Sequence, residues 1–406
     1  MTNRQAAIKI IRRLRRHGFE ALLAGGCVRD MLLRRPATDY DIATDAVPDD
    51  VIKLFRRTLK VGAKFGVVIV LLEGKQVEVA TFRTDTGYAD GRHPAKVKFA
   101  TAAEDASRRD FTINGMFYDP LTKKVIDSVN GRADLKKRLI RTIGRPKERF
   151  SEDYLRMLRA VRFSTQLGFA IEPKTLSAIR RHANNITKIS GERIAMELEA
   201  ILVSPNRSTG ASLLTKSNLA ETVFPGLDSK KIKLAVKVLN QLPKKVDFPL
   251  ALACLFAGCT TEFALDKCRV LKLSRNQTKH IKFLLANRGK LLEDKMSLAE
   301  LNLTLAQPYF RDLYEMQRAI QKAQRKTIAP LTKLRRRIKA LGDIELKPKP
   351  LLDGYELIQL GAVPGPRLGQ LAQEMYIAQL EGNLQTAAQA RQWVQEWLQR
   401  HRMIKE

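Results

Sequence analysis

The sequence predicts an α+β fold, in which a head with a small mixed or antiparallel β-sheet is followed by helical regions. Short apolar runs of strand type, separated by glycine turns, lie within residues 20–143. From residue 149 onward, apolar positions recur at helical spacing. At 406 residues the chain exceeds one comfortable core, so several domains are expected. We divide it into a head and a helical neck, body and tail, over residues 1–145, 146–205, 206–346 and 347–406.

The formal net charge of +31 indicates a polyanionic partner. Residues 1–150 hold 31 Lys and Arg against 18 Asp and Glu, and the remainder holds 42 against 24. The excess is therefore spread along the chain, and nucleic acid is the expected partner. A host or compartment that favours basic proteins is the alternative cause. No run approaches the ~20 apolar residues of a membrane helix, so no membrane association is expected. Four cysteines without paired zinc spacing fit a reducing cytoplasm.

The first elements lead to a stretch rich in glycine and aspartate. Residues 1–17 predict an amphipathic helix with its arginines outward. The stretch EALLAGGCVRDMLLRRPATDYDIATD (20–45) then predicts a strand, a tight glycine turn, a helix and a second strand. That second strand carries Asp39 and Asp41, whose spacing places both carboxylates on one face. Carboxylates this close repel each other, and a divalent cation such as Mg²⁺ resolves the repulsion.

The glycine turn supplies a possible phosphate site next to these carboxylates. Backbone N–H groups at Gly26, at the start of the following helix, can approach a polyphosphate closely because glycine has no Cβ. Arg29, in the first turn of that helix, adds a charged donor. The alternative interpretation is an ordinary glycine turn followed by a solvated acidic strand.

Residues 61–85 predict a β-hairpin, with apolar VVIVLL before a Glu-Gly-Lys turn and an alternating strand after it. A proline-led helix is expected from Pro48. In the second strand of the hairpin, Glu78 faces away from its valine neighbours. It either meets solvent or joins the other carboxylates as a third catalytic group. Residues 84–98, polar and glycine-rich, predict a mobile loop between strands.

Two charged segments follow. In the string RRDFTIN we expect Arg109 to neutralise phosphate charge while Asp110 fixes the direction of that arginine; a hairpin and a short helix then complete residues 117–143. The segment RFSEDYLRMLRAVRF predicts a helix with Ser151 as N-cap. Within it Asp153 and Arg156 are i,i+3 neighbours whose side chains can meet. The basic positions of this helix, Arg156, Arg159 and Arg162, repeat at three-residue steps, which is unfavourable unless an anion lies between them.

Together these segments resemble the class II nucleotidyltransferases, a family of CCA-adding tRNA nucleotidyltransferases and bacterial poly(A) polymerases. The motifs that carry the resemblance are the GG turn with the Asp39/Asp41 pair, RRDFTIN, and the EDxxR of residues 152–156. The resemblance covers residues 20–205 strongly and 353–398 moderately. In this chain Gly115 stands where the family commonly has alanine or serine, a change expected to matter little.

The resemblance implies two-metal nucleotidyl transfer, with Asp39 and Asp41 as Mg²⁺ ligands and Glu78 as a candidate third carboxylate. It implies that Gly26, Arg29 and Arg109 position a triphosphate, and that Asp153, Arg156, Arg159 and Arg162 hold and select the base and ribose. In the family, a carboxylate accepts a hydrogen bond from the exocyclic amino group of cytosine or adenine. A guanidinium donates to a ring nitrogen or carbonyl of the same base. Uracil and guanine would leave the carboxylate unpaired, at a cost of about 1–3 kcal/mol.

The implied partners are tRNA, CTP and ATP, with no obligatory protein partner evident. The residues around Val67 and the compact loop over 84–98 favour CCA or terminal-A addition, although threonine is usual at position 67. Poly(A) addition remains the alternative within the family. A basic RNA-binding relative that has lost catalysis is the alternative from another class, and the intact Asp39, Asp41 and Arg156 argue against it.

Overall fold

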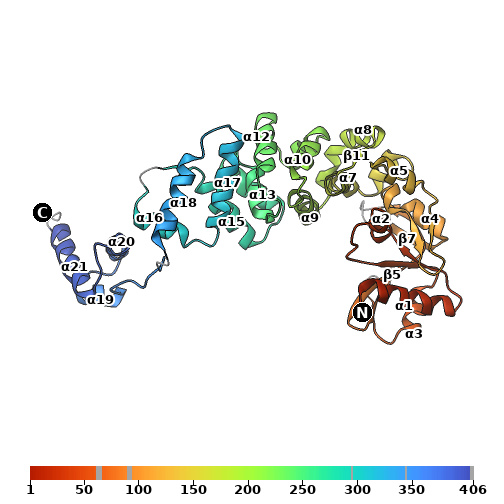
Figure 1. Ribbon diagram of the computed structural model, residues 1–406, viewed down its shortest axis with the longest axis horizontal. Coiled ribbons are helices and arrows are strands. Elements are labelled where there is room, and N and C mark those ends of the chain that lie inside the picture. Colours follow the sequence, from red (N-terminus) through yellow and green to blue (C-terminus); the bar gives the residue numbers. More distant parts are fainter. Residues whose placement is uncertain (61–65, 89–93, 294–295, 343–344, 403–406) are drawn as a thin grey trace. The chain divides into compact units, whose positions relative to one another are not determined.

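The computed structural model describes every residue except 61–65, 89–93, 294–295, 343–344 and 403–406. The chain forms two compact units, Met1–Asn240 with Lys244–Arg275, and Gln241–Pro243 with Asn276–Glu406. The first unit contains a mixed sheet and helices, and the described part of the second is helical (Figure 1). The predicted α+β class is therefore confirmed. The four-part division made from the sequence remains a prediction.

The centre of the head is a mixed sheet. In spatial order its described strands are β3 (Thr58–Leu59), β4 (Val67–Leu72), β5 (Lys75–Thr81), β2 (Asp41–Thr44), β1 (Ala21–Ala24), β8 (Phe117–Asp119) and β9 (Lys124–Ile126). Strands β2 and β5 run parallel, while the other neighbours are antiparallel. The predicted hairpin is β4–β5, whose two-residue turn at Glu73 and Gly74 has positive φ at both positions, as the twist of a hairpin requires.

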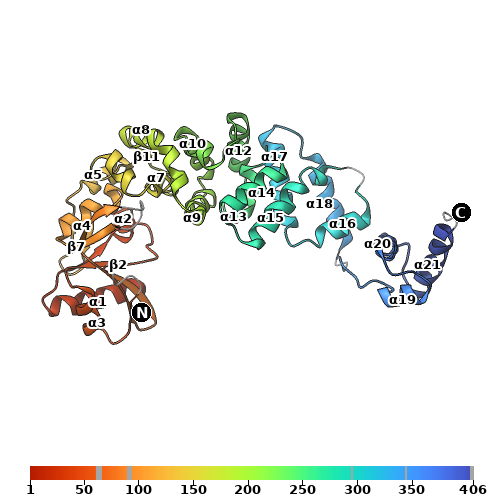
Figure 2. The ribbon, with the colours of Figure 1, turned by 180° about the vertical axis from the view of Figure 1, so that it is seen from behind.

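Helices cover both faces of this sheet. Figures 1 and 2 show α1 (Asn3–Arg16) and α3 (Pro48–Leu54) on one side, and α2 (Gly26–Leu32) and α4 (Ala102–Arg108) on the other. Helix α1 buries five apolar residues completely, and its N-cap Thr2 forms a capping box with Gln5. On the opposite side, Ala106 of α4 packs with Ala43 of β2 and with Phe82 and Phe117.

One predicted element is wrong. Residues 84–98 were expected to be a loop, but β6 (Arg83–Tyr88) and β7 (Pro94–Phe99) form an antiparallel pair. The register runs from Arg83 opposite Phe99 to Tyr88 opposite Pro94. A polar composition is compatible with a two-stranded antiparallel ribbon, so composition alone did not exclude strands. Residues 89–93 of the expected loop lie outside the described residues.

The head ends in short elements that lead to the neck. They are the 3₁₀ turn η2 (Thr112–Asn114), α5 (Gly131–Lys137) and β10 (Leu139–Ile140). Strand β10 pairs in parallel with β11 (Ala170–Ile171), and so ties the end of the head to the first neck helices. The predicted hairpin and short helix over 117–143 are β8, β9 and α5 and are confirmed.

The rest of the first unit is helical. Its elements are α6 (Pro146–Glu152), α7 (Leu155–Leu167), α8 (Pro173–His182), η3 (Ala183–Lys188), α9 (Gly191–Leu202), α10 (Arg207–Lys216), α11 (Leu219–Val223), α12 (Ser229–Asn240), α13 (Phe248–Leu255) and α14 (Thr261–Val270). Helix α7 packs on both α9 and α10. Close approach is needed at Gly191, because a Cβ there would lie 2.0 Å from the carbonyl oxygen of Val270. Cys254, Cys259 and Cys268 are buried in this region and Cys27 is buried in α2, all four without a disulfide bond.

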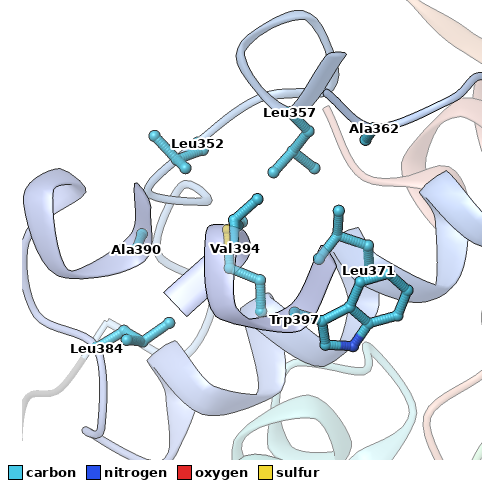
Figure 3. Packing of buried hydrophobic residues seen from close by; sticks show 9 residues of the cluster. Leu352, Leu357, Ala362, Leu371, Leu384, Ala390, Val394 and Trp397 are labelled. Carbon is cyan, nitrogen blue, oxygen red and sulfur yellow. The ribbon is translucent and has the colours of Figure 1, made fainter. Parts of the chain in front are cut away.

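The second unit contains two groups of helices. The first comprises α15 (Arg275–Ala286), η4 (Lys290–Leu292), α16 (Leu298–Leu305), α17 (Phe310–Ala323) and α18 (Ala329–Leu341). The tail comprises α19 (Gly354–Gln359), α20 (Pro366–Leu380) and α21 (Ala387–Arg402). The tail has a core of its own, in which Leu357, Leu371, Val394 and Trp397 point toward one another (Figure 3). Within the described residues, no helix is both long enough and apolar enough to cross a membrane.

Candidate active site

A cavity of about 500 Å³ lies between the glycine turn of the head and helix α7 of the neck. Seven of the predicted site residues line it: Gly26, Arg29, Asp41, Arg109, Asp153, Arg156 and Arg159. Asp39, Glu78 and Arg162 are not part of the lining. The lining also includes Gly25 of the predicted turn and Asp110, which was expected to direct Arg109. The sequence did not single out its other members for the site: Arg108, Asn114, Leu155, Phe163 and Arg193.

The glycine turn lies directly against the side chain of Arg109, which leaves little room for a Cβ at Gly25. Gly25 has φ +71° and ψ −127°, a conformation that L side chains rarely adopt. A Cβ at this position would lie 3.0 Å from Nη1 of Arg109. Glycine at 25 therefore lets strand β1 turn directly into α2 while Arg109 lies against the backbone.

The carboxylates gather at the end of β2, though not in the predicted manner. Strand β2 begins at Asp41, and Asp39 lies in the segment before it, so the expectation that both lie on one strand is wrong. Pairing of β2 with β1 stops where Ala24 meets Asp41, because the chain turns at Gly25. Strands β2 and β5 are parallel, and Ile42 lies opposite Val79. The residues that precede these two, Asp41 and Glu78, therefore lie next to each other on one face of the sheet.

This arrangement raises the pKa of Asp41 from 3.8 to about 6. Loss of hydration at the pocket floor is the main cause, followed by the negative charges of Glu78 and Asp39, and Arg109 partly opposes the rise. A cation bound to these oxygens would relieve the repulsion, and carboxylate oxygen suits a hard divalent ion. No group of three or more His, Cys, Asp or Glu side chains in the described part of the chain is arranged to hold a metal by itself.

Arg29 is held rigidly at the pocket edge. Its Nε and Nη2 donate to the two carboxylate oxygens of Asp30, each at 2.9 Å, and its Nη1 donates to the side-chain oxygen of Asn114 at 2.8 Å. The side chain is only 11% exposed. A bidentate pair of this kind fixes the plane of the guanidinium and leaves few ways for it to rotate.

The carboxylate that orients Arg109 is not the predicted one. Arg109 donates from Nε and Nη2 to one oxygen of Asp105, at 3.1 and 2.9 Å, whereas the other oxygen of Asp105 pairs with Arg108. Asp105 is buried and lies four residues before Arg109 on α4, so the two side chains meet across one helical turn. The expectation that Asp110 directs Arg109 is therefore wrong.

Asp110 instead joins the head to the neck. It accepts from the backbone N–H of Phe111 and the amide of Asn114, and it forms an ion pair with Arg159 of α7 at 2.7 Å. Burial by itself would raise the pKa of Asp110, but Arg159 and Asn114 outweigh it, so the pKa is below its ordinary value. Asp110 is thus ionised and carries the link between the two parts of the site.

The predicted helix over residues 149–163 is interrupted at the functional residue. Helix α6 ends at Glu152, Asp153 is extended (φ −150°, ψ 107°), and α7 begins at Leu155. Ser151 lies inside α6 and is not an N-cap, so that prediction is wrong. At the break, Asp153 accepts from the backbone N–H of Leu155 at 3.0 Å and pairs with Arg193 of α9 at 2.9 Å. Because the break removes Asp153 from the helical spacing, its expected partner Arg156 is replaced by Arg193.

Arg156 is anchored to the preceding helix and to the head. Its Nη1 pairs with Glu152 and donates to the carbonyl of Arg149, and its Nη2 donates to the carbonyl of Arg108 at 3.3 Å. The side chain is 12% exposed, yet it lines the pocket. The guanidinium still has N–H groups without these partners, because it carries five donors in all.

The arginines of α7 are balanced by protein carboxylates. Arg162 pairs with Glu197 of α9 at 3.2 Å, and Arg159 lies 3.9 Å from the same residue. Burial raises the pKa of Glu197, although both arginines oppose the rise. The anion expected between the repeated arginines is therefore in part the protein's own. Arg162 makes this pair outside the lining of the pocket.

Phe163 is surrounded by three guanidinium groups. The guanidinium carbons of Arg29 and Arg159 lie 5.3 Å from its ring centre, and that of Arg162 lies at 4.5 Å. Phe111 packs edge-on against the other part of the ring. Cation–π attraction to the ring of Phe163 thus stabilises arginines from both the head and the neck.

The residues missed from the sequence lie far along the chain from their partners. Arg193, Glu197 and Asn114 were not singled out, because each works through a partner 40, 35 and 85 residues away. A usable indication was the run GERIAMELEA, in which Arg193 and Glu197 are i,i+4 neighbours on a largely apolar helix. Gly115 also matters more than expected, since a Cβ there would lie 2.8 Å from Val129 and 2.9 Å from Ile143.

Comparisons with known proteins agree with this geometry. The family model of the poly(A) polymerase head domain matches residues 21–141, and the model of the probable RNA and SrmB-binding site of polymerase A matches residues 168–231. The CCA-adding enzyme of Geobacillus stearothermophilus is 44% identical over 240 residues, 59% of each chain, so this match spans less than two thirds of that enzyme. The CCA-adding enzyme of Streptococcus gordonii is 34% identical over 385 residues, 94% of each chain.

A solved structure extends the likeness to almost the whole chain. The Bacillus stearothermophilus CCA-adding enzyme, solved in complex with CTP, superposes with a TM-score of 0.83 and 30% identity over 99% of each chain. Together with the match to the Streptococcus gordonii enzyme, this confirms the resemblance inferred from the motifs. Enzymes with such a head generally use divalent metal ions. The chain belongs to the family of CCA-adding enzymes, which are nucleotidyltransferases.

Proposed function

We propose that this protein adds CCA, or its terminal A, to the 3′ end of tRNA, using CTP and ATP without a nucleic-acid template. The observation that carries the proposal is the cavity itself. One side of it holds Asp41, and the other holds Asp153 and Arg156 between anchored arginines. A carboxylate for transfer, and a carboxylate and a guanidinium for base selection, therefore open into one space. The curated relatives that the chain matches are named CCA-adding enzymes.

Asp39 and Asp41 would hold Mg²⁺, with Glu78 close enough to influence Asp41 electrostatically. Bound Mg²⁺ would lower the pKa of the attacking RNA 3′-hydroxyl and stabilise charge on the departing pyrophosphate. Arg29 and Arg109, each fixed by a carboxylate, offer the triphosphate donors whose positions are set before it binds. Gly26 lets the backbone come close to the same group.

Base selection would come from Asp153 and Arg156. One oxygen of Asp153 accepts from Leu155 and the other pairs with Arg193, which orients the carboxylate while each oxygen keeps a free lone pair. That carboxylate would accept from the exocyclic amino group of cytosine or adenine. Arg156 would donate to a ring nitrogen or carbonyl from the N–H groups that its protein partners leave free. Arg159 would contact the base or ribose, and Arg162 would hold α9 in place through Glu197.

The basic neck, body and tail helices would hold the tRNA through its phosphates and shape. We propose the four-part organisation of head, neck, body and tail on this basis. No protein partner is required, and the cytoplasm is the proposed location.

The deciding experiment incubates the protein with Mg²⁺, labelled CTP or ATP, and tRNAs that lack the last one, two or three nucleotides. We expect both nucleotides to be incorporated up to CCA, and Asp39→Ala to abolish incorporation. Absence of incorporation of either nucleotide would refute the proposal. Incorporation of A only into tRNA ending in CC would restrict it to terminal-A addition. Long A tails on unrelated RNA would instead identify a poly(A) polymerase.

A further inference from the structure

Helix α1 carries an unusual charge pattern on its exposed side. The helix has five arginines and one lysine and no acidic residue. Its apolar side is fully buried, and Arg4, Lys9, Arg12, Arg13 and Arg16 are exposed. We call these five residues the α1 face.

This pattern works against the helix. Arg12 and Arg16 are i,i+4 neighbours, as are Lys9 and Arg13, and like charges at this spacing destabilise a helix. Lys9 is compensated by Glu73 at 2.7 Å, and Arg15 beside the face pairs with Asp119 at 2.9 Å. Among the described residues, neither Arg12 nor Arg16 forms an ion pair. A repulsive cluster without a protein counter-ion indicates an external anion.

The positive surface continues beyond α1. The guanidinium carbon of Arg13 lies 5.2 Å from the ring centre of Phe55, just after α3. The next two residues, Arg56 and Arg57, are both exposed. The contact between Arg13 and Phe55 therefore extends the α1 face with two further arginines.

The sheet separates this surface from the site of transfer. Asp41 points to the same side of β2 as Ala43, which packs with Ala106 of α4. Helices α1 and α3 lie on the other side (Figures 1 and 2). An anion on the α1 face is therefore distinct from the triphosphate in the pocket and from the RNA 3′ end that would be extended there.

We propose that the α1 face binds the phosphate backbone of an RNA segment other than the 3′ end in the active site. Guanidinium groups suit phosphate because they donate in pairs and are weakly hydrated. A lipid surface fits less well, since an interfacial helix must insert its apolar side, and the apolar side of α1 is buried against the sheet. The inference adds a second RNA surface to the proposed function, and its test does not require nucleotide transfer.

The test uses the full chain with one equivalent of unlabelled tRNA and a labelled, blunt RNA duplex, followed by fluorescence anisotropy over a salt series. Arg12→Gln/Arg16→Gln should weaken binding of the duplex by roughly tenfold and reduce the slope of log affinity against log salt by about 2. The matched control is Arg132→Gln/Lys136→Gln, an exposed i,i+4 pair on α5 that removes the same charge. It should leave duplex binding within about twofold of the wild type.

Three further measurements keep the test decisive. The Arg12→Gln/Arg16→Gln variant should melt at the same or a higher temperature, because like-charge repulsion is removed. It should also extend tRNA with unchanged kcat and KM. Equal weakening in both variants would show a net-charge effect and overturn the proposal, as would unchanged duplex binding. A raised KM for tRNA would place the face on the path of the extended RNA. Loss of phosphatidylserine vesicle binding with duplex binding intact would assign the face to membranes.

Discussion

The pocket wall on α7 and the core of the tail are held together by different forces. In the wall, Arg159 is joined to Asp110 of the head by an ion pair, and Arg162, which does not itself line the pocket, pairs with Glu197 of α9. In the tail, nine buried apolar residues meet (Figure 3), and Trp397 among them donates to Glu374 at 2.7 Å. The wall needs particular partners at particular positions, whereas the tail needs volume and apolarity.

The difference shows where each region tolerates change. Ion pairs that are partly buried depend on both partners, because removal of one leaves a desolvated charge. An apolar core tolerates swaps that conserve volume. We therefore expect substitutions in the wall to affect activity and stability together, and substitutions in the tail core to affect stability first.

The largest effect is expected from Asp41→Asn, which removes one charge at the pocket floor. Transfer should fall by at least about a thousandfold, roughly 4 kcal/mol of transition-state stabilisation. The pKa of Asp41 is raised to about 6, so its favourable contribution to folding is lost as the pH rises through 6. The loss begins near pH 3.8 and is complete above pH 6, so Asp41→Asn should raise the melting temperature over that of the wild type more at pH 8 than at pH 5, measured by circular dichroism with a chelator. A melting difference that does not change with pH would contradict this cause.

The expected difference between the pocket wall and the tail core is tested most directly by Asp110→Asn and Leu371→Ala. Leu371 is fully buried in the tail, and its truncation to alanine should lower the free energy of unfolding by about 2–5 kcal/mol. Asp110→Asn should lower the free energy of unfolding by about 1–3 kcal/mol, since Arg159 remains partly exposed. It should also reduce nucleotide transfer strongly.

The chain provides a separate spectroscopic signal for the tail. Its two tryptophans, Trp393 and Trp397, both lie in α21, so tryptophan fluorescence in a urea titration reports the tail. Leu371→Ala should shift the fluorescence transition, whereas Asp110→Asn should leave the fluorescence transition in place and shift only the circular dichroism transition, to which helices of both units contribute. A shift of the fluorescence transition in Asp110→Asn would mean that the regions unfold as one.

The smallest effect sharpens the role of the wall. Arg193→Ala releases Asp153 without removing it, so the KM for CTP and ATP should rise about 5–30-fold, equivalent to 1–2 kcal/mol, with a smaller change in kcat.

Arg156→Ala should relax the choice of base, measured as UTP and GTP incorporation relative to CTP and ATP. Unchanged preference for C and A in Arg156→Ala would refute its role in base selection.

Several parts of the site were predictable because their determinants are local. The amphipathic start predicted α1, the alternating valines predicted the β4–β5 hairpin, and the glycines at 25 and 26 predicted the turn. Asp41 and Arg29 were found by residue type and by resemblance. In each case neighbours within a few positions determine the backbone.

The errors share a different cause. Asp39 was placed on the strand with Asp41, but the strand starts where its partner β1 turns away at Gly25. Asp110 was assigned to Arg109, although Asp105 on α4 lies closer to it and Arg159 takes Asp110. Residues 84–98 were assigned to a loop because composition does not show which segment pairs with which.

The sequence by itself determined the α+β class, the chemical groups of the site and the excess of positive charge, because these follow from composition and local spacing. Only the tertiary structure decided which carboxylate holds which arginine, as for Arg193 with Asp153 and Arg162 with Glu197. The physical reason is that an ion pair depends on the distance between side chains. Folding brings together residues that lie 35 to 40 positions apart.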